Sequence, residues 1–400
     1  MQTVLKRAPY LPKWTLYGWF LYFIAAPFYV FDSGMPQPAD WVMALLFMYL
    51  FIVGARPAVG IQQQVVSKHW HFVFYVTLVN TIWFFFIDQS REKRFPTIVH
   101  SFFYIFNFFT LRAVLILFTS YQEKFLKYTA YAVGAGMIIQ AGLSFVMGST
   151  GSRNALFFNN PNQLGYYALL SGSLFMYVTK HLKLPSYFQL AAFFSFFYLT
   201  LLSSSKAALV GSLILITLAV INQGLLSFKR FVVLGVAIGI GFYFVSNQEL
   251  GSGLLRYSLN RFEMIGESKD DSYEGRGYDR MLNNPEYMII GAGEGGYYRF
   301  DTLLSSGEIH SSFGTIIFCY GILGFFLFFR FVFAIFFKSS FFDVMYFVPI
   351  VAYSITHQGL RDSLLWVFLG VVFVVNCNRF FSRVLNQSVK HKLTVPVART

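Results

Sequence analysis

The stretch GEIHSS, residues 307–312, places a histidine at the threshold of a long apolar segment. His310 is expected at the first turn of a helix beginning there, where the positive end of the helix dipole favours a neutral imidazole. Near neutral pH, such an imidazole can accept a proton from a substrate hydroxyl, as a general base does. The alternative is an interfacial histidine that hydrogen-bonds lipid headgroups, and the local sequence favours neither.

Cationic residues accompany His310 in segments expected at the same surface. Arg276 and Arg280 are four residues apart, which would place them on one face if their segment is helical. Lys206 stands in SSSKAAL, and Arg153 precedes NNPNQLG. Since arginine binds phosphate oxygens in bidentate fashion, convergence of these cations would suit a diphosphate. Ordinary salt bridges with neighbouring acids are the alternative.

Two further motifs are better explained by turns. GAGEGG (291–296) matches G-x-G-x-x-G, but no amphipathic helix and no βαβ unit accompany it, as a dinucleotide site requires. Its glycines could let backbone N–H groups approach an anion. Asp270, Asp271 and Glu274 could hold a divalent cation, but without D-x-D spacing a solvated acidic turn is the better interpretation. We therefore expect no cofactor and no metal.

The composition is that of a membrane protein. Of 400 residues, 56% are hydrophobic and 12% are charged, and apolar segments recur along the whole chain. About twelve candidate spans lie at residues 15–31, 40–54, 70–87, 97–118, 128–147, 163–179, 187–202, 207–223, 231–246, 309–337, 342–356 and 363–377. The predicted fold class is an all-α polytopic membrane protein.

The distribution of lysine and arginine predicts its orientation. With the N-terminus inside, the cytoplasmic segments carry 17 such residues and the short outer connections carry 6. The positive-inside rule therefore favours cytoplasmic N- and C-termini, although the basic segment 88–96 then falls outside. The net charge of +13 is mostly explained by this asymmetry, so nucleic acid is not an expected partner.

One outer connection is much longer than the others. Residues 247–308 carry 11 of the chain's 18 carboxylates, and apolar residues at helical spacing over 254–266 predict an amphipathic helix on the outer membrane surface. The predicted organisation is nine spans over 1–246, a folded loop over 247–308, and three spans with a cytoplasmic tail over 309–400. Such a concentration of ionisable groups favours a site in this loop, although any solvated loop is charged.

Several motifs together resemble a known group of membrane enzymes. NNPNQLG, LTLLSSSKAAL, GRGYDR, GAGEGG and EIHSSFGTIIFCYGILG follow one another between about residues 150 and 377. They resemble the bacterial O-antigen ligase and polymerase superfamily (WaaL and Wzy), multi-span glycosyltransferases of the GT-C fold. Ligases of that group carry H-[NSQ]-x9-G-x-x-[GTY], which His310, Ser311, Gly321 and Gly324 match in full.

Other parts of the family pattern are matched less closely. Arg280 and Gly291 meet a looser polymerase pattern, R-x10-G, whereas Arg153 and Gly165 miss it by one residue. Lys206 stands where the family usually has arginine. Lysine keeps the positive charge but lacks the planar guanidinium group that binds two oxygens at once.

The resemblance implies a donor glycan on undecaprenyl diphosphate, used at the periplasmic face of the bacterial inner membrane. Transfer would invert the anomeric centre without a metal. By analogy, Arg276 and Arg280 would neutralise the leaving diphosphate, and His310 would orient or deprotonate the acceptor hydroxyl. The substrate-binding residues expected beside them are Lys206, Arg153 and Glu308.

The predicted activity is polymerisation of lipid-linked oligosaccharide repeats, as in O-antigen synthesis. The first alternative is a ligase that transfers finished polymer to lipid A–core, so the acceptor is either a glycan or lipid A–core. The expected partners are these substrates, membrane lipid and, for a polymerase, a chain-length regulator. A flippase or transporter of lipid-linked glycan is the second alternative, and it predicts charges along a central path and paired discontinuous helices.

Overall fold

The computed structural model describes residues 10–58, 60–91, 96–147, 153–222, 260, 263, 272–300 and 307–394. Within these residues, helices joined by turns and loops make up the chain and no strand is present. The elements are α1 (Trp14–Ala25), α2 (Pro38–Ile52), α3 (Ile61–Phe86), η2 (Gln89–Arg91), α4 (Val99–Tyr121), α5 (Glu123–Met147), α6 (Pro161–Thr179), α7 (Ser186–Ser203), α8 (Lys206–Asn222), α11 (Asp279–Asn283), α12 (Tyr287–Ile290), η4 (Tyr297–Arg299), α13 (Ser312–Phe336), α14 (Phe341–Met345), α15 (Val348–Thr356) and α16 (Ser363–Thr394).

Most predicted spans coincide with a helix, but several of their bounds were wrong. Helix α3 begins at Ile61, before the predicted residue 70, and α16 continues to Thr394, past the predicted residue 377. The first span was expected to reach residue 31, but α1 ends at Ala25, just before Pro27. The eleventh, 342–356, is divided into α14 and α15, and Pro349 lies in the first turn of α15, where proline is tolerated. The ninth predicted span, 231–246, and nearly all of the predicted surface helix at 254–266 lie outside the described residues.

The described helices have the properties of a membrane protein. Four of them, α4, α5, α7 and α13, are long and apolar enough to cross a membrane, and shorter apolar helices accompany them. Large apolar side chains face outward, among them Phe51, Phe85 and Phe333, whose exposed fractions are 74–77%. Such exposure would be costly in water and is expected for a surface that faces lipid. The total of twelve spans and the GT-C fold stay predictions.

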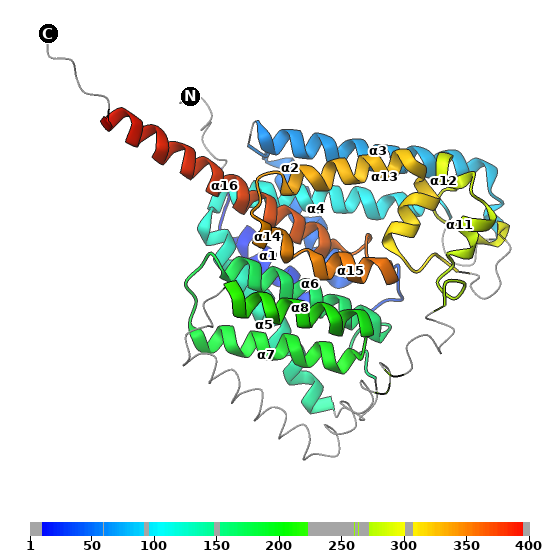
Figure 1. Ribbon diagram of the computed structural model, residues 1–400, viewed down its shortest axis with the longest axis horizontal. Coiled ribbons are helices and arrows are strands. Elements are labelled where there is room, and N and C mark those ends of the chain that lie inside the picture. The colour runs from blue at the N-terminus through cyan, green and yellow to red at the C-terminus, as the bar shows by residue number, and fades with distance from the viewer. Residues whose placement is uncertain are drawn as a thin grey trace, which may run out of the picture.

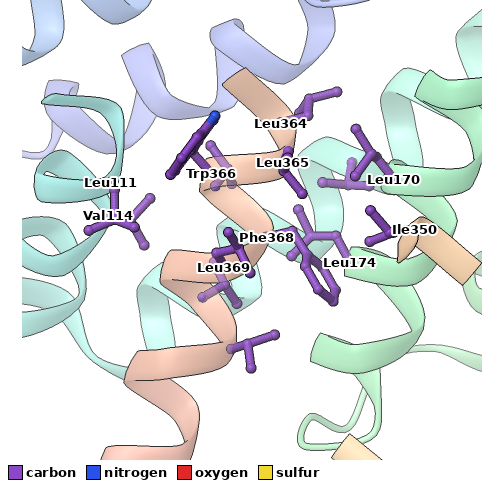
Figure 2. Packing of buried hydrophobic residues seen from close by; sticks show 14 of the residues in the cluster. Leu111, Val114, Leu170, Leu174, Ile350, Leu364, Leu365, Trp366, Phe368 and Leu369 are labelled. Atoms are coloured by element: carbon purple, nitrogen blue, oxygen red, sulfur yellow. The ribbon is translucent and has the colours of Figure 1, made fainter. Parts of the chain in front are cut away.

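The first half of α16 lies at the centre of the bundle. Residues 364–377 are all buried, as is expected of a helix that is apolar on every side. Figure 2 shows its side chains between Leu111 and Val114 of α4 on one side and Leu170 and Leu174 of α6 on the other. Elements from both halves of the chain therefore share one core.

The two ends of the bundle hold different connections (Figure 1). We call the end that carries residues 272–300 and 307–311 the loop end. There, the Tyr298 hydroxyl donates to the Asp88 carbonyl at 3.0 Å. At the opposite end, the Asp343 carboxylate accepts from Lys180 at 3.0 Å and from Arg379 at 3.1 Å. Connections that the sequence assigns to one side of a membrane thus contact one another, as alternating crossings require.

Helix α13 is broken at Gly321, and a loop fills the break. Gly321 has φ +65° and ψ −175°, which interrupts the helical hydrogen bonds around it. The freed carbonyls of Phe318 and Cys319 accept from the backbone N–H groups of Ala292 and Gly293, both at 2.9 Å. Since lipid supplies no replacement hydrogen bonds, a membrane helix can be broken only where protein satisfies its backbone. The 291–296 loop is therefore packed into the bundle.

We expect Gly321→Ala to destabilise the protein. A Cβ there would lie 2.4 Å from the Ile289 carbonyl oxygen, and the positive φ disfavours any L side chain. The expected loss is about 1–3 kcal/mol, measured as a lower unfolding temperature of the detergent-purified protein. Gly142→Ala is the matched control, because a Cβ in that helix would meet nothing within 4 Å. Equal unfolding temperatures for the two variants would contradict the prediction.

Candidate functional site

His310 and Arg276 meet at the loop end. The His310 backbone N–H donates to the Arg276 carbonyl at 3.0 Å. The sequence predicted His310 in the first helical turn, and this prediction was wrong, because α13 begins at Ser312. Ser311 is the N-cap of α13, and its hydroxyl accepts from the Gly314 N–H at 3.1 Å. His310 therefore lies just before the helix, and its side chain is exposed. Serine takes the N-cap because its oxygen can satisfy a backbone N–H that the helix leaves unpaired.

Arg276 is anchored to the end of α15. One of its guanidinium nitrogens, Nη1, donates to the Thr356 carbonyl. The neighbouring Tyr278 hydroxyl donates to the Ile355 carbonyl at 2.6 Å. These are the last carbonyls of α15, which lack partners within the helix, and cationic or hydroxyl donors there complement the negative end of its dipole. Arg276 thus joins the His310 segment to α15.

Arg153 and Lys206 lie at the same end, beside α6 and α8. The Arg153 Nε donates to the Ser203 carbonyl at 3.2 Å, and its Nη2 donates to the Asn162 side chain. The Asn162 carbonyl in turn accepts from the Tyr353 hydroxyl of α15 at 2.8 Å. Lys206 is the first residue of α8, one residue before the predicted eighth span, and follows Ser203, the last residue of α7, after a short turn. Arg153 and Arg276 are therefore both connected to α15.

Arg276 and Arg280 do not share a helix face. Helix α11 begins at Asp279, so Arg276 precedes it, and the two guanidinium groups contact different neighbours. Arg280 is fully buried, and its guanidinium lies 5.0 Å from the centre of the Tyr297 ring. Burial lowers the pKa of Arg280 from its ordinary value. The prediction of one shared face assumed a longer helix than the segment forms.

Glu308 is bound by a residue that the sequence analysis did not select. Its Oε2 accepts from the Arg361 Nη2 at 2.7 Å, and its side chain is 36% exposed. Arg361 also donates through Nε to the Glu294 Oε1 at 3.0 Å, and its Nη2 reaches the same oxygen. Glu308 thus lies in an ion-pair network with Arg361 and Glu294.

Glu294 is the centre of this network and is fully buried. Its Oε2 accepts from the Tyr320 hydroxyl at 2.6 Å and from the Tyr104 hydroxyl at 3.1 Å, and its backbone N–H donates to the Asn80 side chain at 2.9 Å. A buried carboxylate is tolerated when it is paired and its lone pairs are satisfied, and both conditions hold here. The network joins α3, α4, α13 and the connection before α16.

The charges in this network alter one another's protonation. Burial raises the pKa of the Glu294 carboxyl, but the Arg361 guanidinium and the Tyr320 hydroxyl together hold it below its ordinary value. Burial lowers the pKa of Arg361, but Glu294 and Glu308 together raise it well above its ordinary value. Glu294 is therefore ionised and Arg361 is protonated at neutral pH.

Asp362, next to Arg361, is a second residue that the sequence analysis missed. Burial raises the pKa of its carboxyl to about 7, and a hydrogen bond from the Leu364 N–H limits the rise. That bond, 2.8 Å long, makes Asp362 part of the turn that starts α16. A carboxyl with such a pKa can accept a proton near neutral pH. The RD pair in HQGLRDSLL is the only sequence signal that could have pointed to it.

The loop end also contains an apolar groove beside the His310 segment. It has a volume of about 220 Å³ and is lined by Tyr278, Met281, Ser311, Phe313, Gly314, Ile317, Phe325 and Ile355. Its lining combines Ser311, the residue after His310, with four residues of α13 and with Ile355 of α15. Since Ile355 is 52% exposed, the groove is open to the outer surface of the bundle. An apolar, open surface therefore lies beside the His310 segment.

The glycine-rich segment has the backbone geometry of turns. Gly291, Gly293, Gly295 and Gly296 all have positive φ, which fits the turn interpretation of GAGEGG. Asp270 and Asp271 lie outside the described residues. In the part of the chain that the structure describes, no group of three His, Cys, Asp or Glu residues is arranged to hold a metal.

Comparison with known proteins adds no assignment. No protein-family model matches the chain, and no match was found among the curated proteins. The arguments below therefore depend on the residues and their geometry.

We expect the stability of the protein to fall in acid because of Glu294. Its pKa is depressed in the folded state, so the stabilisation is present above the unfolded pKa of about 4.3 and is lost as the pH falls through the folded pKa. Glu294→Gln should lower the unfolding temperature at pH 7 and flatten its dependence on pH below about 4.5. Glu286→Gln, at an exposed position, is the control. Parallel acid profiles for Glu294→Gln and the wild type would contradict this assignment.

Proposed function

We propose that the protein is a membrane glycosyltransferase that polymerises oligosaccharide repeats carried on a polyprenyl diphosphate. The observation that carries the proposal is the apolar groove lined by Ser311, which follows His310, and by Tyr278, two residues after Arg276. A lipid-linked diphosphate has an anionic head and a long apolar chain. Arginine at the polar end and an open apolar groove below it complement both parts.

The charges at the loop end support the diphosphate part of this substrate. Arg276 binds the Thr356 carbonyl of α15, and Arg153 is connected to Tyr353 of the same helix through Asn162, so both charges lie near the end of α15. Lys206 begins α8, which packs against α15. Cationic groups fixed before the reaction stabilise the charge that develops on a leaving diphosphate. We assign this role to Arg276, with Arg153 and Lys206 assisting. Arg280, buried against Tyr297, would support the segment that presents Arg276.

The proposed step is a single displacement. The acceptor hydroxyl oxygen attacks the anomeric carbon of the donor sugar, and a new glycosidic C–O bond forms on the face opposite the leaving group. The bond from the anomeric carbon to the diphosphate oxygen breaks, and its electron pair leaves with the diphosphate. His310, exposed at the head of the groove, takes the hydroxyl proton.

The ligase is the second candidate, and one observation favours it. Gly321 of the ligase-type motif is the residue at which α13 is broken, so this part of the motif has a structural role here. A transporter would share a broken helix. In the described residues, however, the break is closed by the hydrogen bonds of Ala292 and Gly293, which leaves less reason to propose a path through it.

The decisive experiment is a comparison of surface polysaccharide and lipid-linked intermediates in a strain that lacks the protein. Core carrying a single repeat indicates the polymerase. Bare core, with long polymer left on the lipid carrier, indicates the ligase. Repeats trapped on the cytoplasmic face would replace both with the transport function.

His310→Ala or Arg276→Ala, each expressed in the strain that lacks the protein, should lower activity about 100-fold or more without loss of membrane insertion. His71→Ala and Arg56→Ala, both at exposed positions, are matched controls that should retain activity.

Filling the apolar groove should weaken donor binding. Ile317 lines the groove and is half-buried, whereas Ile322, on the same helix, is 63% exposed and does not line it. We expect Ile317→Trp to raise the KM for a long-chain lipid-linked donor about tenfold, equivalent to about 1.4 kcal/mol. A donor with a truncated lipid should be affected much less, because it loses little contact with the groove. Ile322→Trp is the control, and an equal effect of both tryptophans would count against the groove as the lipid site.

A further inference from the structure

We propose that Arg361 is a positioning residue, which holds the His310 segment in place through Glu308. The inference rests on the proposed function, since it concerns the proton acceptor of that reaction. Glu308 precedes His310 by two residues, and its carboxylate is bound to the Arg361 Nη2 at 2.7 Å. No side-chain hydrogen bond of Glu308 to His310 is found in the described part of the chain, so the effect of Glu308 on His310 passes through the backbone.

Arg361 is itself fixed. Its guanidinium uses Nε and Nη2 to bind Glu294, which is fully buried and also accepts from the hydroxyls of Tyr320 and Tyr104. The guanidinium also lies over the Phe103 ring, with 5.6 Å between its central carbon and the ring centre. A planar guanidinium held in this way points its remaining donors in a set direction. Arg361 is therefore a rigid anchor for the exposed carboxylate of Glu308.

The two carboxylates have different functions. Glu294 and Arg361 already balance one negative with one positive charge inside the bundle, so Glu308 is not needed to neutralise Arg361. Glu308 is 36% exposed, and a pair that water reaches contributes little to stability, about 0–1 kcal/mol. The contact instead restrains the backbone two residues before His310, next to the buried Ile309, and other attachments follow later along the chain.

Those other attachments hold the segment on its second side. The His310 N–H donates to the Arg276 carbonyl at 3.0 Å, and the Ser311 hydroxyl donates to the Ser354 carbonyl at 3.3 Å. The Ser312 N–H and hydroxyl both donate to the His357 carbonyl at 3.1 Å. With Glu308 bound, the backbone is restrained on both sides of His310. Without it, the backbone before His310 keeps the buried side chain of Ile309 and loses the ion pair that restrains it two residues before His310.

The test measures backbone restraint and activity separately. In hydrogen–deuterium exchange of the purified protein, Glu308→Ala should speed exchange in the peptide that contains residues 307–311 several-fold, while the unfolding temperature stays within a few degrees of the wild type. Glu286→Ala, at an exposed position in the neighbouring segment, should leave that exchange unchanged. In the glycosyltransferase assay, Glu308→Ala should lower kcat about tenfold with little change in the KM of the donor. Glu308→Gln, which keeps an oxygen acceptor for Arg361, should recover part of the loss.

Arg361→Lys gives a second test. Lysine keeps the positive charge beside Glu294 but lacks the fork that reaches both carboxylates, so local exchange should rise as it does in Glu308→Ala. Unchanged exchange of the 307–311 peptide in Glu308→Ala would overturn the inference, whatever the activity. A kcat that falls in step with a general loss of folded protein would also overturn it. If exchange rises while the wild type transfers no glycan, the anchor stands and the proposed function fails.

Discussion

The buried carboxylate of Glu294 imposes a constraint on which the loop end of the bundle depends. An ionised group in an apolar interior is stable only when it is paired and hydrogen-bonded, so the chain must bring several donors to one point. Arg361 supplies the charge, Tyr320 and Tyr104 supply hydroxyls, and Asn80 binds the backbone of the same residue. These groups come from α3, α4, α13 and the turn before α16. The packing of these helices and the position of the glycine-rich loop therefore both depend on keeping the Glu294 carboxylate paired.

The break in α13 also helps to hold Glu294 inside the bundle. The loop can carry Glu294 into the bundle only if its own backbone groups find partners there, and the carbonyls freed at Gly321 provide them. The Trp83 indole N–H adds a donor to the Gly291 carbonyl at 2.9 Å. Glycine is needed on both sides of this contact because a Cβ at Gly291 would lie 2.8 Å from the Cys319 oxygen. The loop thus belongs to the core, although it connects two surface segments.

This construction explains why an exposed histidine has a defined position. His310 has no helix around it, but the residues on both sides are attached to Arg361, Arg276 and α15. Rigid support of this kind is what a residue that accepts a proton needs, since catalysis depends on geometry within a fraction of an ångström. The apolar groove, whose lining includes Ser311, lies beside the same segment. The cationic residues, His310 and the groove lining come from separate parts of the chain.

The sequence by itself determined the helical class and most helix positions. It also placed His310, Arg276, Arg153 and Lys206 at the same end of the helical bundle. It could do so because apolar length and charge placement act locally along the chain. Only the tertiary structure decided that Arg280 is buried, that His310 precedes its helix, and that Glu308 binds Arg361. It alone placed Glu294 at the centre of the buried network of the loop end, 67 residues along the chain from its partner Arg361. Such a pair leaves no local pattern, because the free energy that stabilises it comes from burial and from donors on distant helices.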